Sequence, residues 1–145
     1  IKGPDRFIEI VKYFDEIKES LVVLLTGKRR QYVIENLENL NIKYRYFPME
    51  ELETINELYN VLDLYIVSSR IEGGPQAILE CAISKTPIIS TDVGIAGEIL
   101  DNTSIFSMDD FQLAEPNIEI AYNNELKFKF SVQQNLFKKM FLEII

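Results

Sequence analysis

The chain has 145 residues, of which 47% are apolar, enough for one compact core and too few for two. Acidic side chains outnumber basic ones by 23 to 15, giving a formal charge of −8. The sequence contains no basic stripe with interleaved aromatic residues, so nucleic acid is not an expected partner. It also contains no His, so its chemistry must rest on carboxylates, cationic side chains and backbone groups, and zinc is not expected.

The lone Cys81 has no partner for an internal disulfide, and the sequence shows neither a signal-type leader nor an apolar run long enough for a bilayer. We therefore expect a cytoplasmic protein, with peripheral contact at the inner face of a membrane left open for a longer chain. Ile1 is not an initiator Met, so we expect residues 1–145 to be a single domain cut from a longer protein.

Helical and strand patterns alternate along most of the chain. Apolar residues at helical spacing predict a first helix from Pro4 to Ile17. The continuous apolar run 21–25 predicts a strand buried on both faces. The remaining predicted helices cover 33–40, 52–59 and 75–85, and the remaining predicted strands cover 43–47, 62–67 and 87–90. This order predicts an α/β fold with right-handed crossovers and a parallel sheet covered by helices on both faces.

The pattern weakens after residue 100. Residues 104–106 are predicted to form a last short strand. The C-terminal residues predict an amphipathic helix with a wide apolar face, which we expect to dock on a neighbouring domain. The apolar residues of that helix are Leu136, Phe137, Met140, Phe141 and Ile144.

The most informative loop follows the predicted strand 62–67, because ligands of open parallel sheets bind beyond the carboxyl ends of the strands. Residues 68–75 read SSRIEGGP. Gly73 and Gly74 let the backbone approach a ligand closely, and Pro75 suits the first position of a helix. The amide N–H groups and the positive dipole end of that helix point into the loop, so the sequence predicts a seat for a phosphate or diphosphate.

Two glutamates flank this seat. Glu80 lies about 7.5 Å further along the helix axis, where its carboxylate can accept both hydroxyls of a ribose. Glu72 precedes the helix and faces the opposite end of the ligand. The alternative interpretation is that both are solvated side chains beside a helix start.

Glu72 and Glu80, with seven residues between them, resemble the E-x7-E motif of retaining glycosyltransferases of family 4, which have the GT-B fold. Other segments match that family in chain order and extend the resemblance over roughly residues 2–100. They are Lys2-Gly3, Leu58-Tyr59, the DLYIV run before Ser69, and the PII and TDVG runs before Glu98.

The resemblance implies a Rossmann-like doubly wound sheet, the C-terminal half of a GT-B enzyme whose acceptor-binding domain is absent from this chain. Carried over by position, Glu72 is the expected catalytic residue and contacts the transferred sugar together with the amides of Gly73 and Gly74. Lys2 contacts the donor diphosphate and Glu80 the ribose. The backbone near Phe47 and Pro48 borders the base.

The implied reaction moves a hexose from a UDP- or GDP-sugar to a polysaccharide or glycolipid acceptor, with retained anomeric configuration. Cationic side chains and helix dipoles stabilise the leaving diphosphate, so neither a metal ion nor a cofactor is expected. The isolated domain should bind donor weakly and transfer nothing, because the acceptor side is missing. The alternatives are a related nucleotide-sugar epimerase, a sugar phosphorylase, or a nonenzymatic regulatory or scaffolding module.

Further candidates are open to two interpretations. Lys28, Arg29 and Arg30 follow a strand end and are candidates for phosphate contacts, or form a solvated basic face. Ser69 is a donor-site candidate whose hydroxyl shapes the loop or touches the ligand. Cys81 lies among small apolar residues, so we interpret it as part of the core and not as a nucleophile.

The sequence also departs from the family. Lys85 stands where the family usually has Gly, so its helix must end on a left-handed non-glycine residue or another cap, at a cost of about 1 kcal/mol if left-handed. Ile95 replaces a second Gly in the loop of Gly94, which argues against a close approach of that loop to the diphosphate. The family's first strand, and an Arg that usually precedes the Lys, would lie before Ile1.

Overall fold

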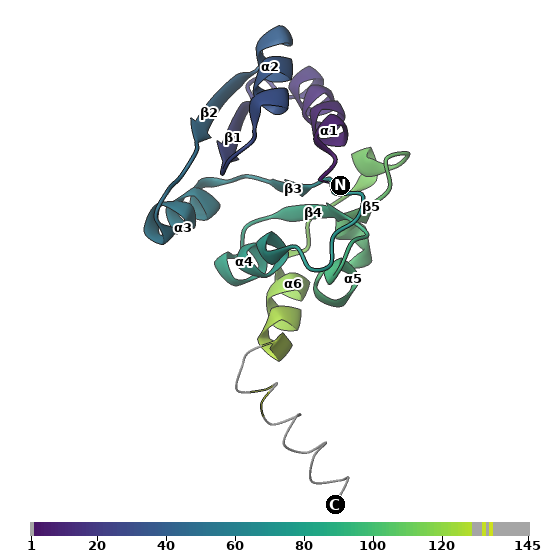
Figure 1. The fold of residues 1–145 in the computed structure, drawn as a ribbon. Coiled ribbons are helices and arrows are strands. Elements are labelled where there is room, and N and C mark those ends of the chain that lie inside the picture. Colours follow the sequence, from purple (N-terminus) through teal and green to yellow (C-terminus); the bar gives the residue numbers. More distant parts are fainter. Residues whose placement is uncertain (1, 129–131, 133, 135–145) are drawn as a thin grey trace, which may run out of the picture.

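A computed structural model describes residues 2–128, 132 and 134, so the predicted helix over 136–144 lies outside the described residues. Helices and strands alternate from the first described residues, as predicted (Figure 1). The N-terminal elements are α1 (Pro4–Ile17), β1 (Val22–Thr26), α2 (Gln31–Asn39), β2 (Lys43–Phe47), α3 (Leu52–Val61) and β3 (Tyr65–Val67). They are followed by α4 (Gln76–Ser84), β4 (Ile88–Thr91), α5 (Ala96–Ile99), β5 (Ile105–Phe106) and α6 (Ile118–Glu125), with single 3-10 turns at Asn102–Ser104, Phe111–Leu113 and Leu126–Phe128.

All the strand pairs are parallel, which confirms the predicted α/β class. The strands form two sheets, however, and not the single sheet that the sequence predicts. One has the order β1-β2 and the other the order β3-β4-β5. In the classic doubly wound order another strand lies between these two groups, and no strand of the described part of the chain pairs with the second edge of β1 or with that of β3.

The three-stranded sheet is covered on both faces, because neighbouring residues of β4 point to opposite sides. Ile88 packs in a cluster with α4, α5 and α6. Ile89 packs in another cluster with Ile10 of α1 and Phe106 of β5. Figure 1 shows α1 and the helices α4, α5 and α6 on opposite sides of this sheet.

The two-stranded sheet is covered less completely. Val23 and Leu25 of β1 are buried against α1 and α2, where Val11 and Leu37 complete a cluster. Val22, in contrast, is 52% exposed, so the prediction that the apolar run 21–25 is buried on both faces is wrong. The helices that cover β1 lie on one side of it, and α3 packs against α4 instead of on the second face.

The helix α4 begins and ends with defined caps. The sequence predicts Pro75 at the first helical position, but Pro75 is the N-cap and α4 begins one residue later, because the Pro75 ψ of 109° is extended and the Pro75 carbonyl accepts from the Ile78 amide. At the other end Lys85 is left-handed, with φ 58° and ψ 31°, as expected for a residue in place of Gly. The Thr86 amide donates to the Cys81 carbonyl at 2.9 Å, which closes a Schellman motif.

Candidate functional site

The loop between β3 and α4 lies against the start of α1. Gly3, the N-cap of α1, has a φ of 60°, and a Cβ atom there would lie 2.1 Å from the carbonyl oxygen of Ser68. The Ser68 hydroxyl donates to the Gly3 carbonyl at 3.0 Å. Only glycine permits this approach, so the Lys2-Gly3 pair is fixed beside the loop by its own backbone.

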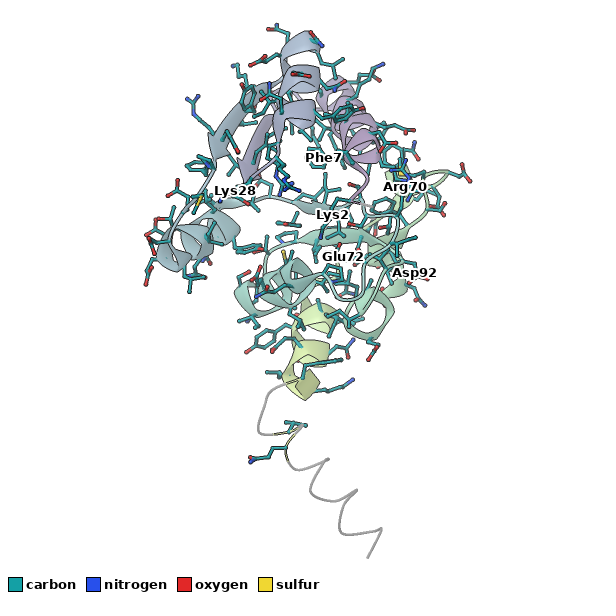
Figure 2. All side chains as sticks on the ribbon, in the orientation of Figure 1. Lys2, Phe7, Lys28, Arg70, Glu72 and Asp92 are labelled. Atoms are coloured by element: carbon teal, nitrogen blue, oxygen red, sulfur yellow. The ribbon has the colours of Figure 1, made fainter. Side chains whose placement is uncertain are left out.

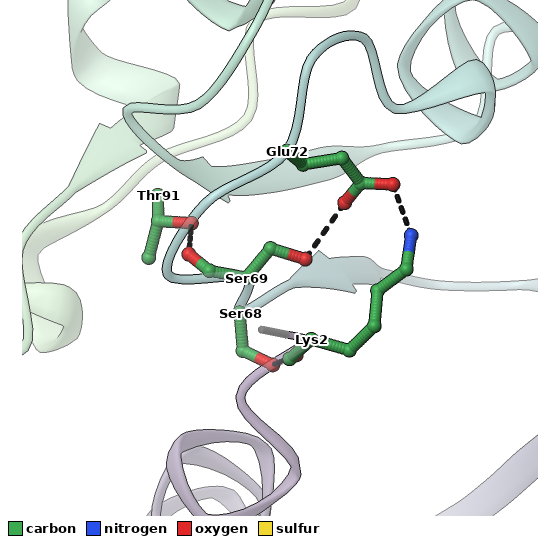
Figure 3. Close-up of polar contacts among 5 residues, drawn as sticks. All are labelled: Lys2, Ser68, Ser69, Glu72 and Thr91. Carbon is green, nitrogen blue, oxygen red and sulfur yellow. Dashed lines mark hydrogen bonds and ion pairs between the residues drawn. The ribbon is translucent and has the colours of Figure 1, made fainter.

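Glu72 is held by two donors from different segments (Figure 3). The Lys2 ammonium forms an ion pair with Glu72 Oε1, and the Ser69 hydroxyl donates to Oε2 at 2.7 Å. The Ser69 carbonyl in turn accepts from the Thr91 hydroxyl at 2.7 Å, which ties the loop to β4. The structure therefore brings together three residues that the sequence singled out, which are 70 positions apart at the extremes.

The charge of Glu72 follows from these contacts. Burial acts to raise the pKa of the Glu72 carboxyl, but the hydrogen bonds from Lys2 and Ser69 and the charge of Lys2 outweigh it, so the pKa lies below its usual range. Glu72 is therefore a carboxylate at neutral pH, able only to accept hydrogen bonds. Its side chain is 17% exposed, whereas that of Lys2 is 67% exposed.

The backbone next to Glu72 is open. A Cβ atom on Gly73 or Gly74 would meet nothing within 4 Å, and both residues are exposed. The first residue of α4, Gln76, is exposed as well. Within the described part of the chain no side chains pack over the beginning of α4. This helix follows the carboxyl end of β3, as the sequence predicts.

The loop that contains Gly94 packs against the backbone of Gly73 and Gly74. Gly94 has a φ of 54°, and a Cβ atom there would lie 2.8 Å from the carbonyl carbon and oxygen of Gly73. Glycine is thus required at position 94 to pack against Gly73. The contact gives Gly94 a role within the protein and does not depend on a ligand.

Glu80 has a partner that the sequence did not predict. The Tyr59 hydroxyl, from the last turns of α3, donates to Glu80 Oε2 at 2.5 Å. Burial, with the neighbouring Tyr65 and Glu80, raises the pKa of Tyr59 above its usual range, so the phenol keeps its proton and donates. The spacing of Tyr59 places it on the apolar face of a helix, so the sequence pattern predicts its burial and does not predict this contact.

Arg70 is a second residue whose partner was not predicted. Its guanidinium forms a two-fold hydrogen-bonded ion pair with Asp5 in the first turn of α1, one of the contacts being 2.7 Å long. This pair is a second link between the loop and α1. The charges of Arg70 and Asp5 neutralise each other, and Arg70 lies apart from Lys2 and Glu72 (Figure 2).

Other sequence candidates lie apart from the Glu72 loop. Phe47 and Pro48 are at the carboxyl end of β2, where the Phe47 carbonyl accepts from the Gly27 amide at 3.0 Å. Lys28 and Arg29 are exposed beyond the end of β1, and no described residue pairs with either charge. Arg30 turns back and donates to the Thr26 carbonyl at 2.7 Å, so its Nε is used within the protein.

Cys81 is fully buried in the cluster of α4 and β4, and burial raises the pKa of its thiol above the usual range, with Glu80 adding to the effect. The prediction that it belongs to the core is confirmed. Among residues 2–128, 132 and 134, no group of three acidic, His or Cys side chains is arranged to hold a metal ion. In the same residues no helix is both long enough and apolar enough to cross a membrane.

Comparison with known proteins identifies the class of this fold. The fold is that of one half of a GT-B glycosyltransferase. The chain belongs to the family described as "Glycosyl transferases group 1", whose model matches residues 1–127. No curated protein matches it in sequence.

A solved structure with a similar fold is that of AviGT4, a glycosyltransferase involved in avilamycin A biosynthesis. It is 16% identical, with a TM-score of 0.57, and the match covers 87% of this chain and 43% of that chain. The likeness confirms the fold. The present chain spans less than half the length of that structure.

Proposed function

We propose that this chain is the donor-binding domain of a retaining glycosyltransferase of family 4. It binds a UDP- or GDP-hexose, and the sugar passes to a polysaccharide or glycolipid acceptor held by another domain. The observation that carries the proposal is the ionised Glu72 held between Lys2 and Ser69, next to the open backbone of Gly73 and Gly74.

Glu72 is suited to a sugar. Each of its oxygens accepts one hydrogen bond from the protein and retains capacity for another, so sugar hydroxyls can donate to it. Ser69 fixes its orientation. The open space in front of Gly73 and Gly74 allows a hexose to approach without displacing a side chain.

Lys2 is suited to a diphosphate. Its ion pair with Glu72 is largely exposed on the lysine side, so the pair contributes little stability and the ammonium can turn to a phosphate at small cost. The unpaired amides at the start of α4 lie beyond the same loop. Together they supply positive charge for the leaving diphosphate without a metal ion. Lys28 and Arg29 are further candidates for phosphate contacts.

The first test is calorimetry of the 145-residue chain with UDP, GDP and ADP, each with and without EDTA. We expect micromolar-to-millimolar binding of one of the first two, unchanged by EDTA. The Lys2→Gln variant should bind about tenfold more weakly, as for a hydrogen bond between charged groups. Lys12→Gln is the matched control, because Lys12 is an exposed lysine of α1, the helix that begins two residues after Lys2. Absence of binding to all three nucleotides would show the proposal to be wrong.

The second test separates the sugar from the nucleotide. Glu72→Gln should weaken binding of a UDP- or GDP-hexose while leaving the affinity for the free nucleotide diphosphate nearly unchanged. Glu57→Gln, an exposed glutamate of α3, is the control. If Glu72→Gln weakens binding of the nucleotide-hexose and of the free nucleotide diphosphate equally, Glu72 does not contact the sugar. The proposal that the chain binds a nucleotide would still stand in that case. In the longer enzyme the same variant should lower turnover.

A further inference from the structure

The hydrogen bond between Tyr59 and Glu80 joins two helices that are separate in the sequence. Tyr59 lies in the last turns of α3 and Glu80 in the middle of α4, 21 positions later. The distance of 2.5 Å between the Tyr59 hydroxyl and Glu80 Oε2 is that of a strong charge-assisted contact. Both side chains are half-buried, so the contact is partly shielded from water.

The Tyr59 side chain is fixed independently of Glu80. Its ring stacks on that of Tyr65, with 5.6 Å between ring centroids and an interplanar angle of 26°. Its carbonyl accepts from the Thr86 hydroxyl at 2.9 Å. The phenol oxygen is therefore presented to Glu80 by a residue already held at its ring and its backbone.

The backbone of Glu80 is tied into the same contacts. The Ser84 hydroxyl lies 2.7 Å from the Glu80 carbonyl and 2.7 Å from the Thr86 hydroxyl. The two hydroxyl protons can serve only two of three contacts at once, these two and that of Thr86 with the Tyr59 carbonyl, so the carbonyls of Glu80 and Tyr59 are not joined by one continuous chain of hydrogen bonds. Tyr59 and Glu80 are thus joined directly by their side chains, and the Thr86 hydroxyl, just after α4, lies within hydrogen-bond distance of the Tyr59 carbonyl.

Glu80 keeps one oxygen for another donor. In the described part of the chain only Tyr59 hydrogen-bonds its carboxylate, and it uses Oε2. A carboxylate fixed at one oxygen has its second oxygen already oriented, so a ligand that donates to it does not have to order a free side chain.

We propose that Tyr59 is a positioning residue for Glu80, which it holds so that the second carboxylate oxygen accepts the ribose hydroxyls of the donor nucleotide. The inference rests on the proposed function. A purely structural contact between α3 and α4 is the competing explanation, and it predicts loss of stability without a change in how the protein distinguishes sugars.

The test measures ribose discrimination. The 145-residue chain is titrated with UDP or GDP, whichever binds, and with the corresponding 2′,3′-dideoxynucleotide, and the ratio of the two affinities is compared between variants. Wild type should prefer the ribose form by about tenfold. Tyr59→Phe keeps the stacked ring and removes only the hydroxyl, so it should reduce the ratio by about fivefold, the effect of one hydrogen bond.

Two further variants complete the design. Glu80→Gln should reduce the ratio at least as much, and the double variant should lose no more than Glu80→Gln alone, because the two residues act as a unit. Tyr44→Phe is the matched control, since the Tyr44 hydroxyl donates to Glu38 at 2.7 Å on α2 and β2, away from the loop. It should leave the ratio unchanged. Thermal melts of each variant establish that it is folded.

The outcomes are distinct. If wild type prefers ribose and Tyr59→Phe has the same ratio, Tyr59 is only a structural contact and the inference is wrong, while the proposed function stands. If wild type shows no preference, Glu80 does not accept the ribose and the inference fails with it. If wild type binds none of the nucleotides, the proposed function itself is wrong.

Discussion

Replacing Gly3 with Ala should strongly destabilise the fold. The left-handed backbone at φ 60° costs about 1 to 2 kcal/mol for a residue with a Cβ. The added atom would also lie 2.1 Å from the Ser68 carbonyl oxygen, so the end of β3 must move and the 3.0 Å hydrogen bond from Ser68 is lost. Together these effects should lower the free energy of unfolding by about 3 to 5 kcal/mol.

Urea unfolding followed by circular dichroism measures this loss, and Gly27→Ala separates its two causes. Gly27 has a φ of 77°, but the nearest atom to an added Cβ is the flexible end of Arg30, at 3.6 Å. It should therefore lose only about 1 kcal/mol, the conformational part. Equal destabilisation by the two substitutions would refute the close contact between Gly3 and Ser68.

Three further predictions concern the loop, acid stability and the end of α4. Gly74→Ala should change the free energy of unfolding by less than about 0.5 kcal/mol, yet lower the affinity for a UDP- or GDP-hexose in calorimetry, because its Cβ enters the open space that the proposal gives to the hexose; a large loss of stability would contradict this. Hydrogen bonds lower the pKa of Asp5, through Arg70, and of Glu72, where they outweigh burial, so the folded state holds these protons less tightly than the unfolded chain. Their stabilisation is present above the ordinary values of 3.8 and 4.5 and is lost as pH falls further, so melting temperatures should be level from about pH 7 to pH 5.5 and then fall; a higher melting temperature at about pH 3 than at pH 6 would count against these ion pairs. Lys85→Gly should stabilise the protein by about 1 kcal/mol in a Tyr122→Leu background, and less in wild type, where it also removes the contact of the Lys85 ammonium with the Tyr122 ring. Chemical denaturation of wild type, the two single variants and the double variant tests this last prediction, which fails if glycine destabilises both backgrounds.

The local elements could be predicted from the sequence because each depends on neighbouring residues. The strand Lys43–Phe47 matches its prediction at both ends, and Pro48 ends it as expected. The strand predicted over 62–67 is shorter and begins at Tyr65, because Leu62 serves as the C-cap of α3. Sheet pairing was not predictable in the same way, since β1 and β3 each have an apolar pattern that does not specify a neighbour.

In the candidate site, too, some residues could be found from the sequence, whereas contacts between distant segments could not. Glu72, Lys2 and Ser69 were singled out from three segments that resemble the same family, and the structure brings them into contact, while their roles toward a ligand stay predictions. The partner of Glu80 was missed, since a tyrosine at an apolar helical position indicates burial and gives no sign of its hydroxyl contact. The ion pair of Arg70 with Asp5 depends on how the loop lies against α1, which the sequence pattern does not contain.

Consecutive residues of α1 belong to different apolar clusters, Ile10 with the three-stranded sheet and Val11 with the two-stranded one. The helix α1 therefore packs against both sheets of the domain. A small rotation of it would be transmitted directly to Lys2, which precedes its first turn, and so to the charge beside Glu72. The charge beside Glu72 is thus coupled to both apolar clusters through α1, in addition to the tie of its loop to β4 through Ser69 and Thr91.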